Sequence, residues 1–275
     1  MRILILGATG FLGSTLLGYA ESSGYTVLGT SRYAHNQSNI ISMDVTDKSV
    51  VEHIIKENLP DVVIWTLLSR DNEDVLINTG LTNLLSAISE RTKLIFISSD
   101  GVFTKGEGDY TESDNALPVT EGTSLSTYVN SKILGEKKAQ YMHSNHIIIR
   151  TGPLYGKDSN QNIEQRTKRV LRRIDGNSYS EAATNLYKTF VHVDDLSKAI
   201  IELLIMDFRG ILHVGPTQKE SYYTFYKQRI KSFGYDESLI QLNEISPSDQ
   251  PFLPLDTSLN THKAKKILKT KFRNV

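Results

Sequence analysis

The sequence predicts an α/β fold, in which a doubly wound parallel sheet carries a smaller mixed lobe. A glycine-rich turn, Gly7 to Gly13, directly follows a short apolar run and opens a helical pattern. Through the first half of the chain, short β-branched runs alternate with helical patterns, which is typical of a parallel sheet with crossover helices. After residue 150 this alternation loosens. We therefore expect a larger domain over residues 1–150 and a smaller lobe over residues 151–275, some of whose segments return to the sheet.

The expected elements follow from the apolar patterns. Continuous apolar runs suit central strands that are buried on both faces, and the chain has five of them: Ile3–Leu6, Thr26–Gly29, Val62–Trp65, Leu94–Ser98 and Ile147–Arg150. Helical periodicity fills the spaces between them, at Leu12–Ser22, Lys48–Asn58, Val75–Glu90 and Ser126–Ser144. In the second part we expect helices at Asn162–Ile174, Asp194–Met206 and near Tyr222–Phe233, and a further strand at Leu212–Val214.

The composition is that of an ordinary globular protein. The chain has 275 residues, 39% of them hydrophobic, so it can bury a sizeable core. Its 31 Lys and Arg balance 31 Asp and Glu, so no overall charge draws nucleic acid or an anionic membrane. Because cysteine is absent, disulfides, thiolate metal sites and cysteine nucleophiles are excluded. The longest apolar runs are too short to cross a bilayer, and we expect a cytoplasmic protein without a metal site.

The turn between Gly7 and Gly13 predicts a dinucleotide site. Gly7 permits a tight turn, Gly10 lets the backbone approach a pyrophosphate at the helix N-terminus, and Gly13 allows the helix to pack closely on the strand. Phe11 and Leu12 open that helix and complete the cofactor-binding segment. A glycine turn without a ligand is the alternative, but the strand before it and the helix after it favour a cofactor.

Residues at the carboxyl end of the second strand and shortly after it predict whether NADP(H) or NAD(H) binds. The second strand leads into Ser31 and Arg32, where an acidic residue would hold the 2′-hydroxyl of NAD. An arginine there suits the 2′-phosphate of NADP(H), so NADP(H) is preferred and NAD(H) stays possible; a solvated surface arginine is the alternative. Asp44 and Val45 resemble an Asp-hydrophobic pair of the dehydrogenase family described below, and that resemblance implies that Asp44 holds the edge of the adenine. Asp44 could equally cap the following helix, although Asp47 is the better placed cap.

The most informative group joins Ser99, at the end of a strand, to Tyr128 and Lys132, near the start of a helix. Residues four apart lie on one helix face, about 5–6 Å apart at Cβ. Two unit charges about 4 Å apart interact by roughly 4 kcal/mol at an effective dielectric of about 20, enough to lower a phenol pKa from about 10 to near neutrality. Such a tyrosine exchanges a proton with a carbonyl or alcohol. Alone, the pair is as typical of a surface helix, but together with Ser99 and the glycine turn it predicts a reaction centre.

With these motifs the chain resembles the extended short-chain dehydrogenases/reductases, and within them the dTDP-4-dehydrorhamnose reductase-like group of nucleotide-sugar enzymes. The resemblance implies a Rossmann-type domain. It implies that Ser99 replaces the family's catalytic Thr or Ser, that Tyr128 is the acid and that Lys132 binds the nicotinamide ribose. Ser99 and Asp100 would contact the substrate. The resemblance extends over nearly the whole chain: Gly7 to Gly13, Asp44, Asn78 with Asn83, Ser98 to Phe103, Tyr128 to Lys132, Gly135-Glu136, Arg150, Tyr155-Gly156, Phe190 to Asp195, and Leu255 to Asn260.

Several positions depart from the family pattern. Where the family has Asn-Ala-Ala-Ala beside the nicotinamide ribose, this chain has Trp65 to Leu68, which we expect to be bulkier around the cofactor. The family's Arg-Thr-Ser-Trp at the sugar pocket is replaced by Arg150 to Pro153, and its late Arg-Pro by Leu253-Pro254. Nucleotide-sugar dehydratases resemble this group but place Asp-Glu where this chain has Asp100-Gly101. We thus expect an intact cofactor site and an altered sugar pocket.

The sequence therefore predicts an NADP(H)-dependent reductase of a nucleotide-linked 4-keto-6-deoxy sugar. One alternative is a nucleotide-sugar 4-epimerase that keeps its NAD bound. Another is a non-catalytic, NADP-binding regulatory subunit, since a relative of this reductase group is the partner of a methionine adenosyltransferase. A basic run on the helix near residue 166 could hold a substrate diphosphate, or could be a solvated helix face. The expected partner is a nucleotide sugar, with a homodimer possible.

Overall fold

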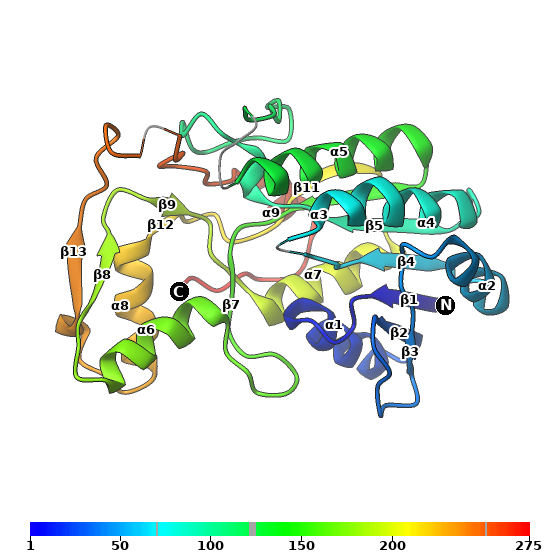
Figure 1. Cartoon of the computed structure of the whole chain (residues 1–275), viewed down its shortest axis with the longest axis horizontal. Helices are drawn as coiled ribbons and strands as arrows, with labels where there is room; N and C mark the ends of the chain where they lie inside the picture. The colour runs from blue at the N-terminus through cyan, green and yellow to red at the C-terminus, as the bar shows by residue number, and fades with distance from the viewer. Residues whose placement is uncertain (70, 121–124, 251) are drawn as a thin grey trace.

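The protein has a central seven-stranded sheet, in which all neighbouring strands are parallel (Figure 1). The structure, a computed structural model, describes residues 1–69, 71–120, 125–250 and 252–275. The strands lie in the order β11-β6-β5-β4-β1-β2-β3. Their bounds are β1 Arg2–Leu6, β2 Thr26–Ser31, β3 Ile40–Ser42, β4 Val62–Trp65, β5 Lys93–Ile97, β6 His146–Arg150 and β11 Gly210–His213. The predicted doubly wound α/β fold is confirmed.

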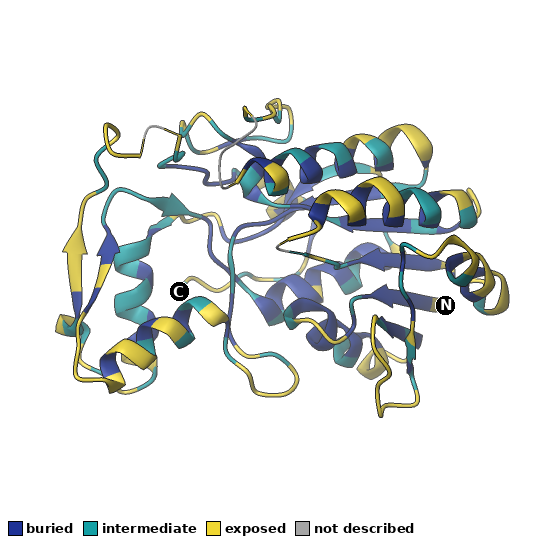
Figure 2. Cartoon of the chain, viewed as in Figure 1, coloured by how far each residue is buried: buried dark blue, intermediate teal, exposed yellow. Residues whose placement is uncertain are grey.

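Helices cover both faces of this sheet, so its central strands β1, β4, β5 and β6 are mostly buried (Figure 2). Helices α1 (Phe11–Ser22), α7 (Val193–Ile205) and α9 (His262–Ile267) share one apolar core with the strands. Helices α2 (Lys48–Asn58), α4 (Thr82–Ala87) and α5 (Ser126–Met142) pack around a second core on the other face. The strand order reverses between β1 and β4, and ligands of open α/β sheets bind beyond the carboxyl ends of the strands at such a point.

Two local features differ from the sequence prediction. The helix expected over residues 75–90 is divided into α3 (Glu73–Val75), a π-helix η1 (Leu76–Leu81) and α4. Gly80 lies in the π-helix with Val45 and Trp65 beside it, and a Cβ built on it would lie 2.6 Å from the Val45 side chain. The short edge strand β3 was not predicted, because three residues are too few for a period-two pattern to show.

The smaller lobe stands beside the sheet, on the left of Figure 1. Strands β8 (Ser180–Ala183) and β13 (Ile240–Asn243) pair in parallel, and α6 (Gln165–Asp175), α8 (Tyr222–Ser232) and the 3₁₀ helix η3 (Glu237–Leu239) pack nearby. Two shorter pairs connect this region with the sheet: β7 (Leu154–Tyr155) with β10 (Val191–His192), and β9 (Tyr187–Lys188) with β12 (Glu220–Ser221). Strand β11, although late in the chain, pairs with β6 in the main sheet.

A buried polar network fastens α5 to the end of β6. Both Glu136 oxygens accept hydrogen bonds from Arg150, at 3.0 and 2.7 Å, and Ser98 Oγ donates to Glu136 at 2.5 Å. His213 lies 3.4 Å from Arg150 and is fully buried. Burial lowers the pKa of His213 to about 4. The network fixes the helix that carries the Tyr128 motif against the strand that borders the site. Across the described ranges, the structure has no helix both long and apolar enough to span a membrane.

Candidate active site

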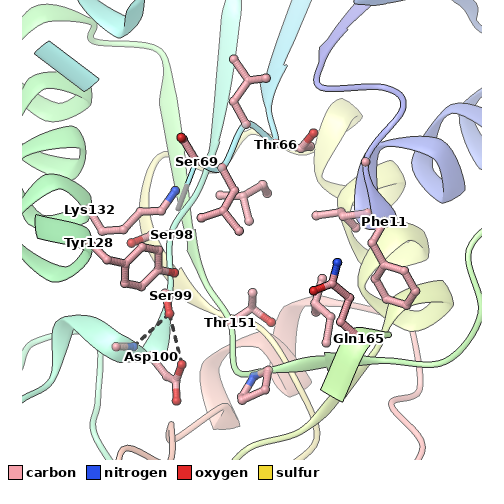
Figure 3. A pocket seen from close by; sticks show the side chains of 18 of the residues that line it. Phe11, Thr66, Ser69, Ser98, Ser99, Asp100, Tyr128, Lys132, Thr151 and Gln165 are labelled. Carbon is pink, nitrogen blue, oxygen red and sulfur yellow. Dashed lines mark hydrogen bonds between the residues drawn. The ribbon is translucent and has the colours of Figure 1, made fainter. Parts of the chain in front are cut away.

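A cavity of about 1820 Å³ opens at the carboxyl edge of the sheet and extends to the smaller lobe. Figure 3 shows Tyr128, Lys132 and Ser99 on one side of it, facing Phe11 and Gln165 on the other. Residues of the glycine turn, of the strand ends and of α6 all line this space. The cavity therefore brings together the predicted cofactor segment and the predicted reaction centre, which lie far apart in the sequence.

The glycine turn has the geometry that a dinucleotide requires. Gly7 has φ of +87°, a left-handed conformation that favours glycine. Gly10 occupies the N-cap of α1 and offers no side-chain hydrogen bond to it, which leaves the first N–H groups of the helix available to an anion. A Cβ on Gly13 would lie 2.1 Å from the Gly7 carbonyl oxygen, so only glycine permits this approach of helix to turn. The residues fit the pyrophosphate of NADP(H) or NAD(H).

The residues predicted to select the cofactor line the same cavity. They are Ser31, Arg32, Asp44 and Val45, and Arg32 is exposed. Asp44 accepts hydrogen bonds from Thr46 N at 2.9 Å and Thr46 Oγ1 at 2.7 Å, and these bonds hold its pKa below the usual range. The carboxylate is thus kept ionised at the cavity wall. Asp47, and not Asp44, caps α2, since it accepts from the N–H groups of Ser49 and Val50.

Ser99 and Asp100 form the floor of the reaction centre. Ser99 precedes the 3₁₀ helix η2 (Asp100–Val102), which follows β5, and Asp100 begins it. Ser99 Oγ accepts from Gly101 N at 3.0 Å and donates to Asp100 Oδ1 at 3.2 Å (Figure 3). The other Asp100 oxygen lies 3.3 Å from Lys188 Nζ and accepts from Thr257 Oγ1 at 2.5 Å. Asp100 therefore orients the serine hydroxyl, and Lys188 balances the charge of Asp100.

Tyr128 and Lys132 lie on the same helix as predicted, but the predicted lowering of the Tyr128 pKa is not found. Both residues lie on α5, and both line the cavity. Lys132 Nζ, however, lies 5.9 Å from the centre of the Tyr128 ring and only 2.9 Å from Glu73 Oε1. Burial raises the pKa of Tyr128 to about 12, while a hydrogen bond with Ser99 opposes the rise. The expected fall of the phenol pKa to near neutrality was therefore wrong, because desolvation of the phenol raises its pKa and, in addition, a carboxylate balances the lysine.

Three residues of the site were missed by sequence reasoning. Glu73, Lys188 and Thr257 come from separate segments, each distant in sequence from the side chain that it contacts. No role was predicted for them, although Thr257 lies in the stretch Leu255 to Asn260 that carries the resemblance, and an acidic residue at the start of a helix near the cofactor strand could have been considered as a partner for Lys132. Trp65, expected to crowd the cofactor, is instead fully buried in the core and stacks on Phe96, while Thr66, Leu67 and Leu68 line the cavity.

The basic run of α6 faces the cavity in part. Arg166, Lys168 and Arg169 line it, and Arg166 donates to the hydroxyl of Tyr222 at 3.4 Å. Several cations on one wall of a cavity form a suitable site for a diphosphate. Within the described part of the chain, no group of three or more His, Cys, Asp or Glu side chains could hold a metal ion.

Comparison with known proteins agrees with this geometry. The family model described as "RmlD substrate binding domain" matches residues 1–274. The chain belongs to this family. The match confirms the predicted nucleotide-sugar reductase group and the predicted class of enzyme, an oxidoreductase.

Individual relatives are distant. The spore coat polysaccharide biosynthesis protein SpsK of Bacillus subtilis is 27% identical over 259 residues, which are 88% of this chain and 82% of that protein. Methionine adenosyltransferase 2 subunit beta of Rattus norvegicus is 28% identical over 166 residues, which are 56% of this chain and 47% of that subunit. The solved dTDP-4-dehydrorhamnose reductase of Bacillus anthracis, in complex with NADP, has a TM-score of 0.81 at 22% identity and covers 98% of this chain and 95% of its own. That likeness supports the fold.

Proposed function

We propose that this RmlD-family chain is an NADP(H)-dependent reductase of a nucleotide-linked 4-keto-6-deoxy sugar. One observation carries the proposal: Tyr128, a half-buried tyrosine whose pKa is raised by desolvation, lies beside Ser99 in the same cavity as the glycine turn. A protonated phenol at this place can give its proton to the oxygen of a ketone as that oxygen gains charge. The cofactor, when bound, supplies the hydride.

Each residue then has a defined task. Tyr128 donates the proton, and Ser99, held by Asp100 and Gly101, contacts the carbonyl oxygen. In this proposal Lys132 holds the nicotinamide ribose, and the segment from Gly7 to Gly13 holds the pyrophosphate. Arg32 binds the 2′-phosphate, which favours NADP(H) over NAD(H), and Asp44 with Val45 borders the adenine.

The smaller lobe, formed by residues 151–275 apart from the segments that return to the sheet domain, is proposed to hold the nucleotide diphosphate. Arg166, Lys168 and Arg169 present positive charge from α6 to the cavity. Thr151, Gly152 and Pro153 line the same space, and Pro153 stands where the family pattern has a tryptophan. The sugar pocket therefore differs from that of typical rhamnose-forming members. The substrate is therefore assigned by class.

One related reaction fits the site less well. A dehydratase needs an acid or base after the catalytic hydroxyl residue, and this chain has Gly101 there, whose built Cβ would lie 3.4 Å from the Tyr128 ring. A 4-epimerase uses the same tyrosine, first as a base and then as an acid, but keeps its NAD bound and returns the hydride to the sugar. Cofactor that dissociates freely and is consumed therefore distinguishes the reductase.

The test is NADPH consumption by the purified protein with a dTDP-4-dehydro-6-deoxy sugar, beside a Tyr128→Phe variant. We expect turnover by the wild type and a loss of 100-fold or more, on the order of a general acid's contribution, in the variant. NADPH binding, measured separately, should be unchanged by the substitution. If both proteins bind NADPH and neither consumes it, the reductase assignment is wrong.

The similarity to methionine adenosyltransferase 2 subunit beta supports a second candidate, a regulatory subunit that binds NADP without catalysis. Affinity purification separates the two candidates: stoichiometric recovery of an adenosyltransferase catalytic subunit, together with no NADPH turnover, supports the regulatory function. Turnover that depends on Tyr128 supports the enzyme.

A further inference from the structure

The ion pair between Glu73 and Lys132 is the strongest feature that the proposed reaction does not yet use. Glu73 is 1% exposed and Lys132 3% exposed, and their charged atoms lie 2.9 Å apart. The second Glu73 oxygen accepts from the backbone N–H of Ser69 at 2.6 Å. Glu73 is thus held by the ion pair at one oxygen and by a hydrogen bond at the other, and each partner offsets the cost of burying the other's charge.

This pair changes what Lys132 can do to Tyr128. The lysine amine lies beside Ser69 in Figure 3, while the Tyr128 ring lies beside Ser99. At 5.9 Å from the ring centre, the lysine charge is already distant from the phenol, and the carboxylate of Glu73 opposes it. The field of an ion pair falls much faster with distance than that of a single charge. The phenol therefore feels little net positive charge from its own helix.

Other charged groups around Tyr128 also come from several elements. Glu73, on α3, and Asp100, on η2, both raise the pKa of the phenol, and Arg166, on α6, lowers it. Burial has the largest effect and raises it. Lys132 lies on the same helix as Tyr128 and carries a positive charge, so its ion pair with Glu73 adds to the effect of burial by limiting the charge that could stabilise a phenolate.

We propose that Glu73 is a positioning residue for Lys132: their buried ion pair holds the lysine amine away from the phenol and opposes the positive charge that the lysine presents to Tyr128. This inference rests on the proposed reductase function and deepens it. With the lysine unopposed, the phenolate form of Tyr128 would be more stable than it is beside the ion pair. Glu73 also holds the lysine amine near the loop before α3, on the side of the cavity where the cofactor ribose is expected.

The test is a cycle of variants read by the ultraviolet absorbance of tyrosinate in the protein without substrate or cofactor. Each titration is compared with that of the same protein carrying Tyr128→Phe, so the difference reports Tyr128 alone. In Glu73→Gln we expect Tyr128 to ionise at least about one pH unit lower than in the wild type, since the lysine charge is then unopposed. In Glu73→Asp, which keeps the charge, most of that shift should be absent.

A double variant guards against loss of folding. Glu73→Gln with Lys132→Gln removes both charges and leaves no unpaired ion, so we expect its Tyr128 titration to return close to the wild type. Lys132→Gln alone leaves the carboxylate unopposed and should move the titration upwards. The proposal is overturned if Glu73→Gln and Glu73→Asp shift the titration equally, or if the foldable variants all titrate as the wild type does.

Activity gives an independent second reading. For the reductase, the alkaline limit of the reduction rate should move to lower pH in Glu73→Gln and follow the absorbance titration, whereas a merely structural role would lower the rate at every pH alike. Because the titration needs no sugar, a protein that shows the predicted titration but reduces no keto sugar would refute the proposed function and leave the role of Glu73 intact.

Discussion

Substitution of Gly13 by alanine tests the glycine turn most directly. A Cβ at this position would lie 2.1 Å from the carbonyl oxygen of Gly7, 2.8 Å from its carbonyl carbon and 3.0 Å from Ala8 Cα. All three atoms belong to the backbone, so no side chain can rotate away. The N-terminus of α1 must therefore move from the turn by about 1 Å, and such overpacking costs about 1–3 kcal/mol of stability.

The same movement displaces the N–H groups that would meet the pyrophosphate. A loss of about 1.4 kcal/mol of binding free energy raises the dissociation constant tenfold. We expect NADPH to bind at least about tenfold more weakly to Gly13→Ala. Gly18→Ala is the matched control, because it lies in the same helix and its Cβ would meet nothing within 4 Å. The control should bind NADPH normally and gain about 0.5–1 kcal/mol in a urea titration. NADPH binding to Gly13→Ala at wild-type affinity would refute this reading of the turn.

Two further predictions concern the buried network. Arg150→Met leaves Glu136 without its ion-pair partner in the core, so urea denaturation should show a loss of about 3–5 kcal/mol in the free energy of unfolding. The double variant Arg150→Met with Glu136→Leu should lose clearly less. Equal losses would contradict the ion-pair argument. The pKa of His213 falls to about 4 on folding, from about 6.5 in the unfolded chain, so the unfolded state binds more protons between these values. Stability should therefore fall as the pH drops from about 6.5 to about 4, by up to about 3 kcal/mol from this residue, and a pH series of urea titrations on His213→Gln should show a shallower fall than the wild type does.

The sequence predicted those parts of the fold that local patterns encode. Central strands such as β1 and β4 are continuous apolar runs, and the turn after β1 has glycines at positions where the backbone requires them. The division of the helix after residue 73 was not predictable, because it depends on Gly80 packing against Val45 and Trp65 from other elements. The pairing of β8 with β13 likewise joins segments with little pattern of their own.

For the site, the sequence predicted which residues meet but not the charges that surround them. Tyr128 and Lys132 lie on one helix, so their spacing alone placed them together. The pKa of Tyr128 depends mainly on burial and further on Ser99, Asp100 and Glu73, and these are tertiary contacts. The contact of Asp100 with Lys188 also brings together distant segments. Electrostatic predictions from a motif therefore need the partners that the fold supplies.

The measurement that tests the central proposal most directly is the transfer of deuterium from NADPH labelled at the reactive position of the nicotinamide. The protein is incubated with the labelled cofactor and a dTDP-4-dehydro-6-deoxy sugar, and the product sugar is analysed by mass spectrometry. A reductase should place one deuterium in the sugar for each NADPH consumed, and Tyr128→Phe should place almost none. A sugar that isomerises without gaining deuterium, or that stays unchanged while NADPH is bound, would contradict the account.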